Sequence, residues 1–263
     1  MPEERMLQRL VAVVVACGGV AAILAGAFGS SSGDALLIAG LILGGALSER
    51  FKVRLFGDSH VSMSVFACMT AALVGGARDA AIVAPLLAIA ANLGGRVPLY
   101  KTAYNCAVYT LSALACMAAF EALDGLRTAE PVTGWMASAT AAAMAYYAVN
   151  AGLVAAAIGM ASGRTLAAVW REKFLWLAPH YLPLGIMVFA AEVGYRAAGA
   201  WSLLLVAAPI ASTHVAMALY STLKESSEAR LAEVESRFQA VEQELARARG
   251  MSGAPGESVG SAA

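Results

Sequence analysis

Six polar side chains in otherwise apolar stretches are the residues of this sequence that could carry chemistry. A polar group inside an apolar helix costs free energy, so such groups mostly serve ligand binding, ion movement or hydrogen bonding. Asparagine offers both a donor and an acceptor, and histidine changes charge near neutral pH. The candidates for a ligand pocket or a switch are Asn92, Asn105, Tyr147, Asn150, His180 and His214. The alternative is that their hydrogen bonds only join neighbouring helices.

No catalytic motif accompanies these residues. The sequence has no HExxH, P-loop, GxSxG or GxGxxG in a suitable context, and its three histidines are dispersed. The four cysteines stand singly in apolar runs, without a CxxC pair, which argues against a zinc site or a disulfide framework. We therefore expect no enzyme activity, no catalytic residue, no metal and no cofactor.

The composition indicates which solvent must surround these residues. Of 263 residues, 60% are hydrophobic and 14% are charged, whereas soluble domains carry roughly 25% charged residues. Eighteen basic and 18 acidic residues give no net charge, which excludes a basic nucleic-acid-binding protein. The sequence predicts an integral membrane protein with lipid around it.

Eight apolar segments are candidates for membrane spans, each needing about 20 residues. They cover residues 8–28, 34–47, 61–77, 80–93, 100–123, 135–161, 174–195 and 200–223. The second, third and fourth are short, so one of them could be re-entrant. Arg78-Asp79 is the expected turn between the third and fourth, and 48–59 the expected short strand or interfacial hairpin. The predicted fold is an all-α polytopic membrane helix bundle over 1–223.

The basic residues predict an orientation for this bundle. Cytoplasmic loops are enriched in Lys and Arg. With the N-terminus inside, 15 of the 18 basic residues fall on the cytoplasmic side, and only Arg78, Arg127 and Arg196 fall outside. We therefore expect a multi-pass protein of a bacterial inner membrane, with both termini in the cytoplasm.

A charged helix is predicted after the last span, over 224–249. Its apolar residues alternate at spacings of three and four, as in a coiled-coil seam. The positions of this seam are Leu231, Val234, Phe238, Val241, Leu245 and Ala248. Arg230 and Arg237 at g positions face Glu235 and Glu242 at e′ positions in a parallel pair. The pattern favours a parallel homodimer over a lone solvated helix, and the tail 250–263 is expected to be disordered.

Smaller features add detail to the spans. Glu192 and Arg196, four residues apart, are expected to form an interfacial ion pair. Prolines in the last two spans are expected to kink them; these are Pro179, Pro183 and Pro209. The residues typical of the aromatic belts at the two membrane surfaces are Tyr146, Tyr147, Trp170, Trp176 and Trp201.

Three stretches carry a family resemblance. They are Glu49-Arg50-Phe51 through Val61-Ser62-Met63-Ser64, Arg96–Lys101 with Tyr104-Asn105, and Tyr147–Asn150 followed by Trp170-Arg171-Glu172. Over about 35–222 the chain resembles the N-terminal membrane-associated, MASE-like sensor region of bacterial HD-GYP and GGDEF signalling proteins. The resemblance implies that a sensed signal passes through a helix to a cyclic-dinucleotide enzyme, with Asn105 and Asn150 as pocket or switch residues. No enzyme domain is expected after the helix here.

Three functions follow from these observations. The leading hypothesis is a dimeric membrane sensor or regulator that signals to a separate cytoplasmic protein through the helix 224–249. The second is a small-molecule transport component, because the short third and fourth spans are similar to substrate-binding membrane components of vitamin uptake systems. The third is a membrane scaffold without a ligand. All three have membrane lipid, and not nucleic acid, as a partner.

Overall fold

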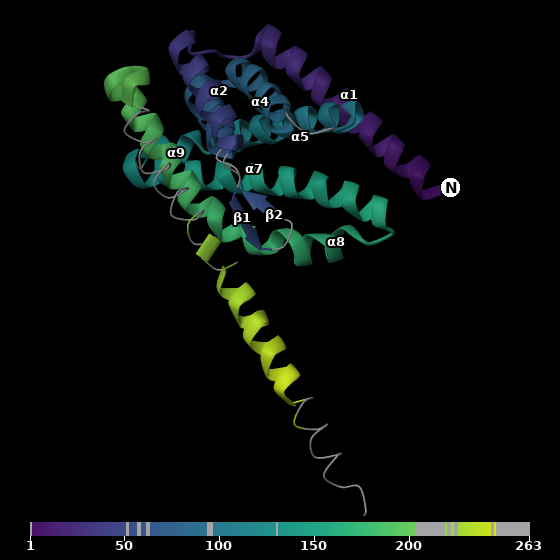
Figure 1. Cartoon of the computed structure of the whole chain (residues 1–263). Helices are drawn as coiled ribbons and strands as arrows, with labels where there is room; N and C mark the ends of the chain where they lie inside the picture. The colour runs from purple at the N-terminus through teal and green to yellow at the C-terminus, as the bar shows by residue number, and fades with distance from the viewer. Residues whose placement is uncertain are drawn as a thin grey trace, which may run out of the picture. The chain divides into compact units, whose positions relative to one another are not determined.

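The computed structural model of the chain describes residues 2–50, 53–56, 59–61, 64–93, 97–129, 131–202, 219, 222–223, 226–242 and 245. The chain divides into two compact units, Met1–His214 and Val215–Ala263. The described residues are helical apart from one short hairpin and the connecting loops (Figure 1). This agrees with the all-α fold predicted from the sequence.

The first unit contains nine α-helices and two strands within its described residues. The helices are α1 (Pro2–Phe28), α2 (Ala35–Arg50), α3 (Ser64–Thr70), α4 (Ala77–Asn92), α5 (Leu99–Glu121), α6 (Asp124–Ala129), α7 (Pro131–Ser162), α8 (Leu166–Val169) and α9 (Ala178–Ala198). The π-helical turn Ala71–Gly75 extends α3, whereas Trp170–Phe174 and the 3₁₀ turn Leu175–Leu177 join α8 to α9. The strands β1 (Val53–Phe56) and β2 (Ser59–Val61) pair antiparallel, with an irregularity between Arg54 and Phe56. Of the strand or hairpin predicted within 48–59, a hairpin is present, but its second strand extends beyond that segment to Val61.

Helix α5 lies at the centre of the packing and contacts α1, α4 and α7, while α9 packs along α7 and α2 packs on α3 and α4. The main core joins buried residues of most of these helices, among them Leu37, Cys68, Leu87, Cys116, Tyr146 and Val188. Helix α9 approaches α7 closely at Gly185, where a Cβ atom would lie 2.7 Å from the Cα of Thr140. Van der Waals packing of small residues is the main source of helix association in an apolar solvent.

Among the described residues, four helices are long and apolar enough to cross a membrane. They cover Glu4–Phe28, Leu99–Glu121, Val132–Ser162 and Leu166–Ser202, in the regions of the predicted first, fifth, sixth and seventh spans. Ala35–Glu49 and Ser64–Gly75 are shorter apolar helices. The expected eighth span, 200–223, falls largely outside the described residues, so the count of about eight spans stays a prediction.

The turn expected at Arg78-Asp79 is wrong by two residues. The chain turns at Gly76, whose φ of 91° is a left-handed conformation that favours glycine. Arg78 and Asp79 instead belong to the first turn of α4, and Asp79 is buried. A carboxylate at this position interacts favourably with the helix dipole and can accept hydrogen bonds from another segment.

The buried Asp79 holds the loop between α1 and α2. Its Oδ1 accepts a hydrogen bond from Ser31 Oγ at 2.6 Å, and its Oδ2 accepts from Ser32 Oγ at 2.7 Å and Ser32 N at 3.1 Å. Asp34 then caps α2 by accepting from the amides of Leu36 and Leu37 and also accepts from the Tyr195 hydroxyl. These bonds fix the ends of α1, α2, α4 and α9 together; we call this the Asp79 end.

The opposite end of the first unit is built from the first halves of α1 and α5 and the second half of α7. Val14 and Tyr104 share a buried cluster against which Leu153 packs. The Tyr104 hydroxyl donates to the Leu153 carbonyl at 2.7 Å. We call this the Leu153 end. In Figure 1 it lies toward the marked N-terminus.

Replacing Asp79 with alanine is expected to destabilise the first unit, because Ser31 and Ser32 lose their shared acceptor. Hydrogen bonds to a charged group contribute enough that we expect a loss of about 3 kcal/mol in the free energy of unfolding. Thermal unfolding of the purified protein in detergent measures this. Glu121→Ala is the control, because Glu121 is exposed; equal unfolding temperatures of the two variants would contradict the role of Asp79.

Candidate functional site

The structure does not join the asparagine and histidine candidates into one pocket. Asn92, half-buried at the end of α4, donates to Ala88 O of its own helix at 3.0 Å. Asn105 and Asn150 are half-buried on α5 and α7, and His180 is exposed on α9. Within the described part of the chain, no hydrogen bond or ring contact links any two of these four. His214 lies outside the described residues, and a binding role for all five stays a prediction.

Tyr147 is the sequence candidate with the most defined surroundings. Its buried hydroxyl accepts from Trp170 Nε1 at 3.1 Å and donates to Phe174 O at 2.9 Å. Its ring centroid lies 5.0 Å from that of Tyr181 and 5.7 Å from that of Trp170. Tyr147 therefore fixes the segment between α8 and α9 against α7.

The aromatic-belt interpretation is wrong for Tyr146. This residue is fully buried in the main core, and its ring stacks 6.4 Å from Tyr181. The sequence of α7 gives no sign of which face of the helix points inward, because its residues are apolar all round. Trp201 is 69% exposed, as a belt residue would be.

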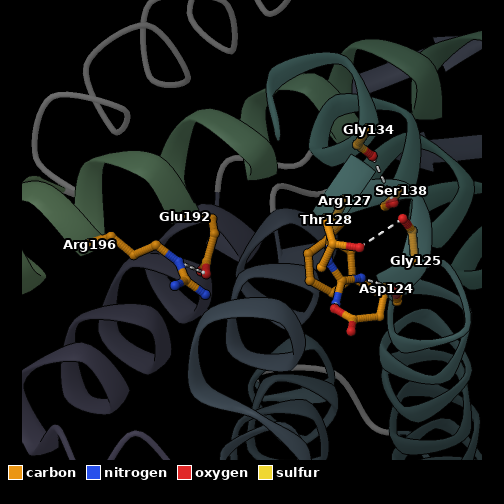
Figure 2. Close-up of polar contacts among 9 residues, drawn as sticks. Asp124, Gly125, Arg127, Thr128, Gly134, Ser138, Glu192 and Arg196 are labelled. Carbon is orange, nitrogen blue, oxygen red and sulfur yellow. Dashed lines mark hydrogen bonds and ion pairs between the residues drawn. The ribbon is translucent and has the colours of Figure 1, made fainter. Parts of the chain in front are cut away.

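Sequence reasoning overlooked a group of charged and aromatic side chains at the Asp79 end. Figure 2 labels its charged members. We call this group the Arg127 cluster. It comprises Phe120, Asp124, Arg127, Trp135, Glu192 and Arg196, from α5, α6, α7 and α9. The only sequence signal was the spacing of Glu192 and Arg196, because the other partners meet through the turn at α6.

Arg127 folds back over the end of α5. Its Nη2 pairs with Asp124 Oδ1 at 2.7 Å, and its Nη1 donates to the Phe120 carbonyl. The guanidinium carbon lies 4.0 Å from the Phe120 ring centroid and 5.3 Å from that of Trp135. The side chain of Arg127 is only 10% exposed, so these contacts replace most of its solvation.

Trp135 connects this arginine to α9. Its ring meets Phe120 edge-on at 5.5 Å, and the guanidinium carbon of Arg196 lies 4.7 Å from its centroid. Arg196 Nε also pairs with Glu192 Oε1 at 2.6 Å (Figure 2). The two arginines therefore share one indole ring, which ties α6 and α7 to α9.

The predicted ion pair between Glu192 and Arg196 is confirmed, but it is only partly exposed. The side chain of Arg196 is 63% exposed, whereas that of Glu192 is 4% exposed. Glu192 Oε2 and Arg127 Nε are buried and have no hydrogen-bond partner among the described residues. Glu192 Oε2 could therefore accept, and Arg127 Nε could donate, one further hydrogen bond. The cluster does not pair a nucleophile with a base.

The loop after α7 carries a second charged pair. Thr165 caps α8 by accepting from the Ala168 amide at 3.3 Å, and Arg164 pairs with Glu172 across the loop. The hydrogen bond and negative charge of Glu172 raise the pKa of Arg164 above its usual value. No group of three His, Cys, Asp or Glu side chains suited to a metal ion occurs among the described residues.

Trp135→Leu should weaken the attachment of α6 and α7 to α9, because both arginines lose their aromatic partner. We expect the free energy of unfolding to fall by about 2 kcal/mol. Thermal unfolding is the measurement, with Trp201→Leu as the exposed control. Combining Trp135→Leu with Arg196→Gln should cost less than the sum of the single changes by about 0.5–1 kcal/mol; strict additivity would show that the stacking contributes nothing.

Arg196→Gln should destabilise the protein more than the double variant Arg196→Gln/Glu192→Gln. The single change leaves a buried carboxylate without its nearest cation, and the second change removes that charge. Because Arg196 is itself exposed, we expect a modest effect of about 1–2 kcal/mol, half or more of it recovered in the double variant. Unfolding temperatures compare the two; a further loss in the double variant would argue against this account.

Comparisons with protein-family models, with curated proteins and with solved structures give no match to the chain.

Proposed function

We propose that this protein is an integral membrane sensor or regulator whose cytoplasmic helix forms a parallel homodimer and signals to a separate cytoplasmic protein. The membrane part would receive a signal, and the helix over 224–249 would carry it out of the membrane. This proposal combines the apolar helices of the first unit with the exposed apolar seam of the second.

A position across a bilayer is supported by the surface and by the spacing of tryptophans. Large apolar side chains such as Val13, Ile23 and Leu43 are exposed on α1 and α2, as expected where lipid tails are the solvent. Along α7, the rise from Trp135 to Gly152 is about 26 Å, close to the roughly 30 Å of a hydrocarbon core. Gly152 lies against the Trp170 ring. This spacing supports a position in which one tryptophan would lie at each boundary.

The orientation is supported by the ends of the first unit. Arg78, Arg127 and Arg196, assigned to the outside by the sequence, all belong to the Asp79 end. Arg9 and Lys101 lie within two helical turns of Val14 and Tyr104, at the Leu153 end. In our proposal the Leu153 end faces the cytoplasm, because it carries the larger number of basic residues.

The observation that carries the proposed dimer is the exposure of the seam. Residues 226–242 are helical (yellow in Figure 1), and the seam residues are 53–67% exposed in the single chain. These residues are Leu231, Val234, Phe238, Val241 and Leu245. An apolar stripe on a charged helix is best stabilised by a second copy. Arg237, paired with Glu233 at 2.7 Å in the single chain, would exchange this pair for Glu242 of the partner helix.

The proposal is tested by fusing a dimerisation-dependent reporter after Arg249. Leu231→Glu with Phe238→Glu places four acidic side chains in the seam of a dimer, and we expect reporter output to fall about tenfold or more. Ala229→Glu with Ser236→Glu is the matched control, because these f positions face away from the seam. Unchanged output from the seam variant would overturn the proposed dimer.

The proposed sensing role of the membrane part is tested with the same reporter. Asn105→Ala and Asn150→Ala should shift the output at equal protein level, since these are the proposed pocket or switch residues. Output equal to wild type in both variants, under conditions where the seam variant is silent, would leave a dimeric scaffold as the function.

A further inference from the structure

The basic side chains at the two ends of the first unit differ in the partners that they contact. At the Asp79 end, Arg78 Nε donates to Gly26 O at 3.0 Å, and Arg127 and Arg196 have their ion pairs. At the Leu153 end, the basic residues include Arg5, Arg9, Lys101, Arg164, Arg171 and Lys173. Among these six, only Arg164 forms an ion pair with a described residue. The other five have no ion pair within the described part of the chain.

Arg171 and Lys173, two of the residues without an ion pair to a described residue, are held at a defined height along α7. The Trp170 indole donates to the Tyr147 hydroxyl, and its ring lies 3.3 Å from where a Cβ of Gly152 would be. Val169 beside it is fully buried. Arg171 and Lys173 follow directly on the same π-helical turn, so the contacts of the half-buried Trp170 fix their height along α7.

The surface around Arg171 and Lys173 combines positive charge with apolar side chains. Arg171 is exposed and Lys173 is half-buried. Leu166 and Leu175, before and after them, are 46% and 53% exposed. The neighbouring Glu172 forms its ion pair with Arg164, and its charge also acts on Lys173. A surface with cations beside exposed leucines matches a molecule with an anionic head and an apolar tail.

We propose that Arg171 and Lys173 bind the phosphate headgroup of an anionic phospholipid, while Leu166 and Leu175 contact its acyl chains. This inference rests on the proposed membrane position. It goes further by proposing which phospholipids the protein prefers. Arg171 would give directed hydrogen bonds to phosphate oxygens, and Lys173 would act as a point charge whose stem lies along the apolar surface. Basic side chains beside a bilayer favour anionic lipids over neutral ones.

The test uses the full chain in nanodiscs of POPC with one-fifth POPG, followed by native mass spectrometry that counts the bound lipids. Wild type should retain POPG in preference to POPC. Arg171→Gln and Lys173→Gln should each lower the apparent affinity for POPG about fivefold, with the double variant losing most of the preference. Exchanging the two cations, Arg171→Lys with Lys173→Arg, should keep the preference.

Arg78→Gln is the matched control, because it removes one positive charge at the other end, where Arg78 Nε donates a hydrogen bond to the Gly26 carbonyl. Wild type without a POPG preference, or an equal loss in Arg78→Gln, would overturn the inference. Displacement of POPG by millimolar inorganic phosphate would also overturn it, by indicating a site for free phosphate. A chain that never enters the nanodiscs would contradict the proposed membrane position itself, whereas one that enters without lipid preference contradicts only this inference.

Discussion

The first unit depends on one constraint: a polar group in an apolar chain must find its partner within the fold. Asp79 illustrates it best. The carboxylate is buried at the start of α4, and two serines from the loop between α1 and α2 satisfy it. Those bonds link segments that lie almost fifty residues apart. An uncompensated buried charge would cost several kcal/mol, so the bonds also determine where α1 ends and α2 begins.

The same constraint explains the Arg127 cluster. An arginine that is 10% exposed has its donors directed to a carboxylate and a carbonyl, and its flat face lies on Phe120. Trp135 then receives a second arginine from α9. Charge, ring face and backbone carbonyl together replace the water that each guanidinium has lost. The result is a rigid junction of four helices at the Asp79 end.

The Leu153 end accommodates its charged side chains differently. Most of its described cations have no ion pair, and the buried contacts there are apolar or involve tyrosine hydroxyls. In our proposal this contrast between an end with two ion-paired arginines and an end with exposed positive charge orients the protein and selects its lipids. Both properties would then come from where ion pairs form, because the total charge of the chain is zero.

The sequence by itself determined the class of the protein and much of its local structure. Long apolar runs predict α1, α5 and α7, and the alternation around Val53 and Leu55 predicts the hairpin, because both patterns reflect the chain's own periodicity. The heptad seam was also visible, and its residues are exposed in the single chain, as an unpaired seam would be. Composition and basic residues sufficed to propose a membrane and an orientation.

Only the tertiary structure decided which polar residues are buried and what they meet. Arg78-Asp79 has the composition of a turn, yet Asp79 lies in a helix. Its buried carboxylate accepts hydrogen bonds from serines 47 and 48 residues away. Tyr146 and Tyr147 are adjacent in sequence, but one lies in the core and the other fixes Trp170. The partners of Arg127 and Trp135 come from separate helices. Such pairings depend on long-range packing, which local spacing does not encode.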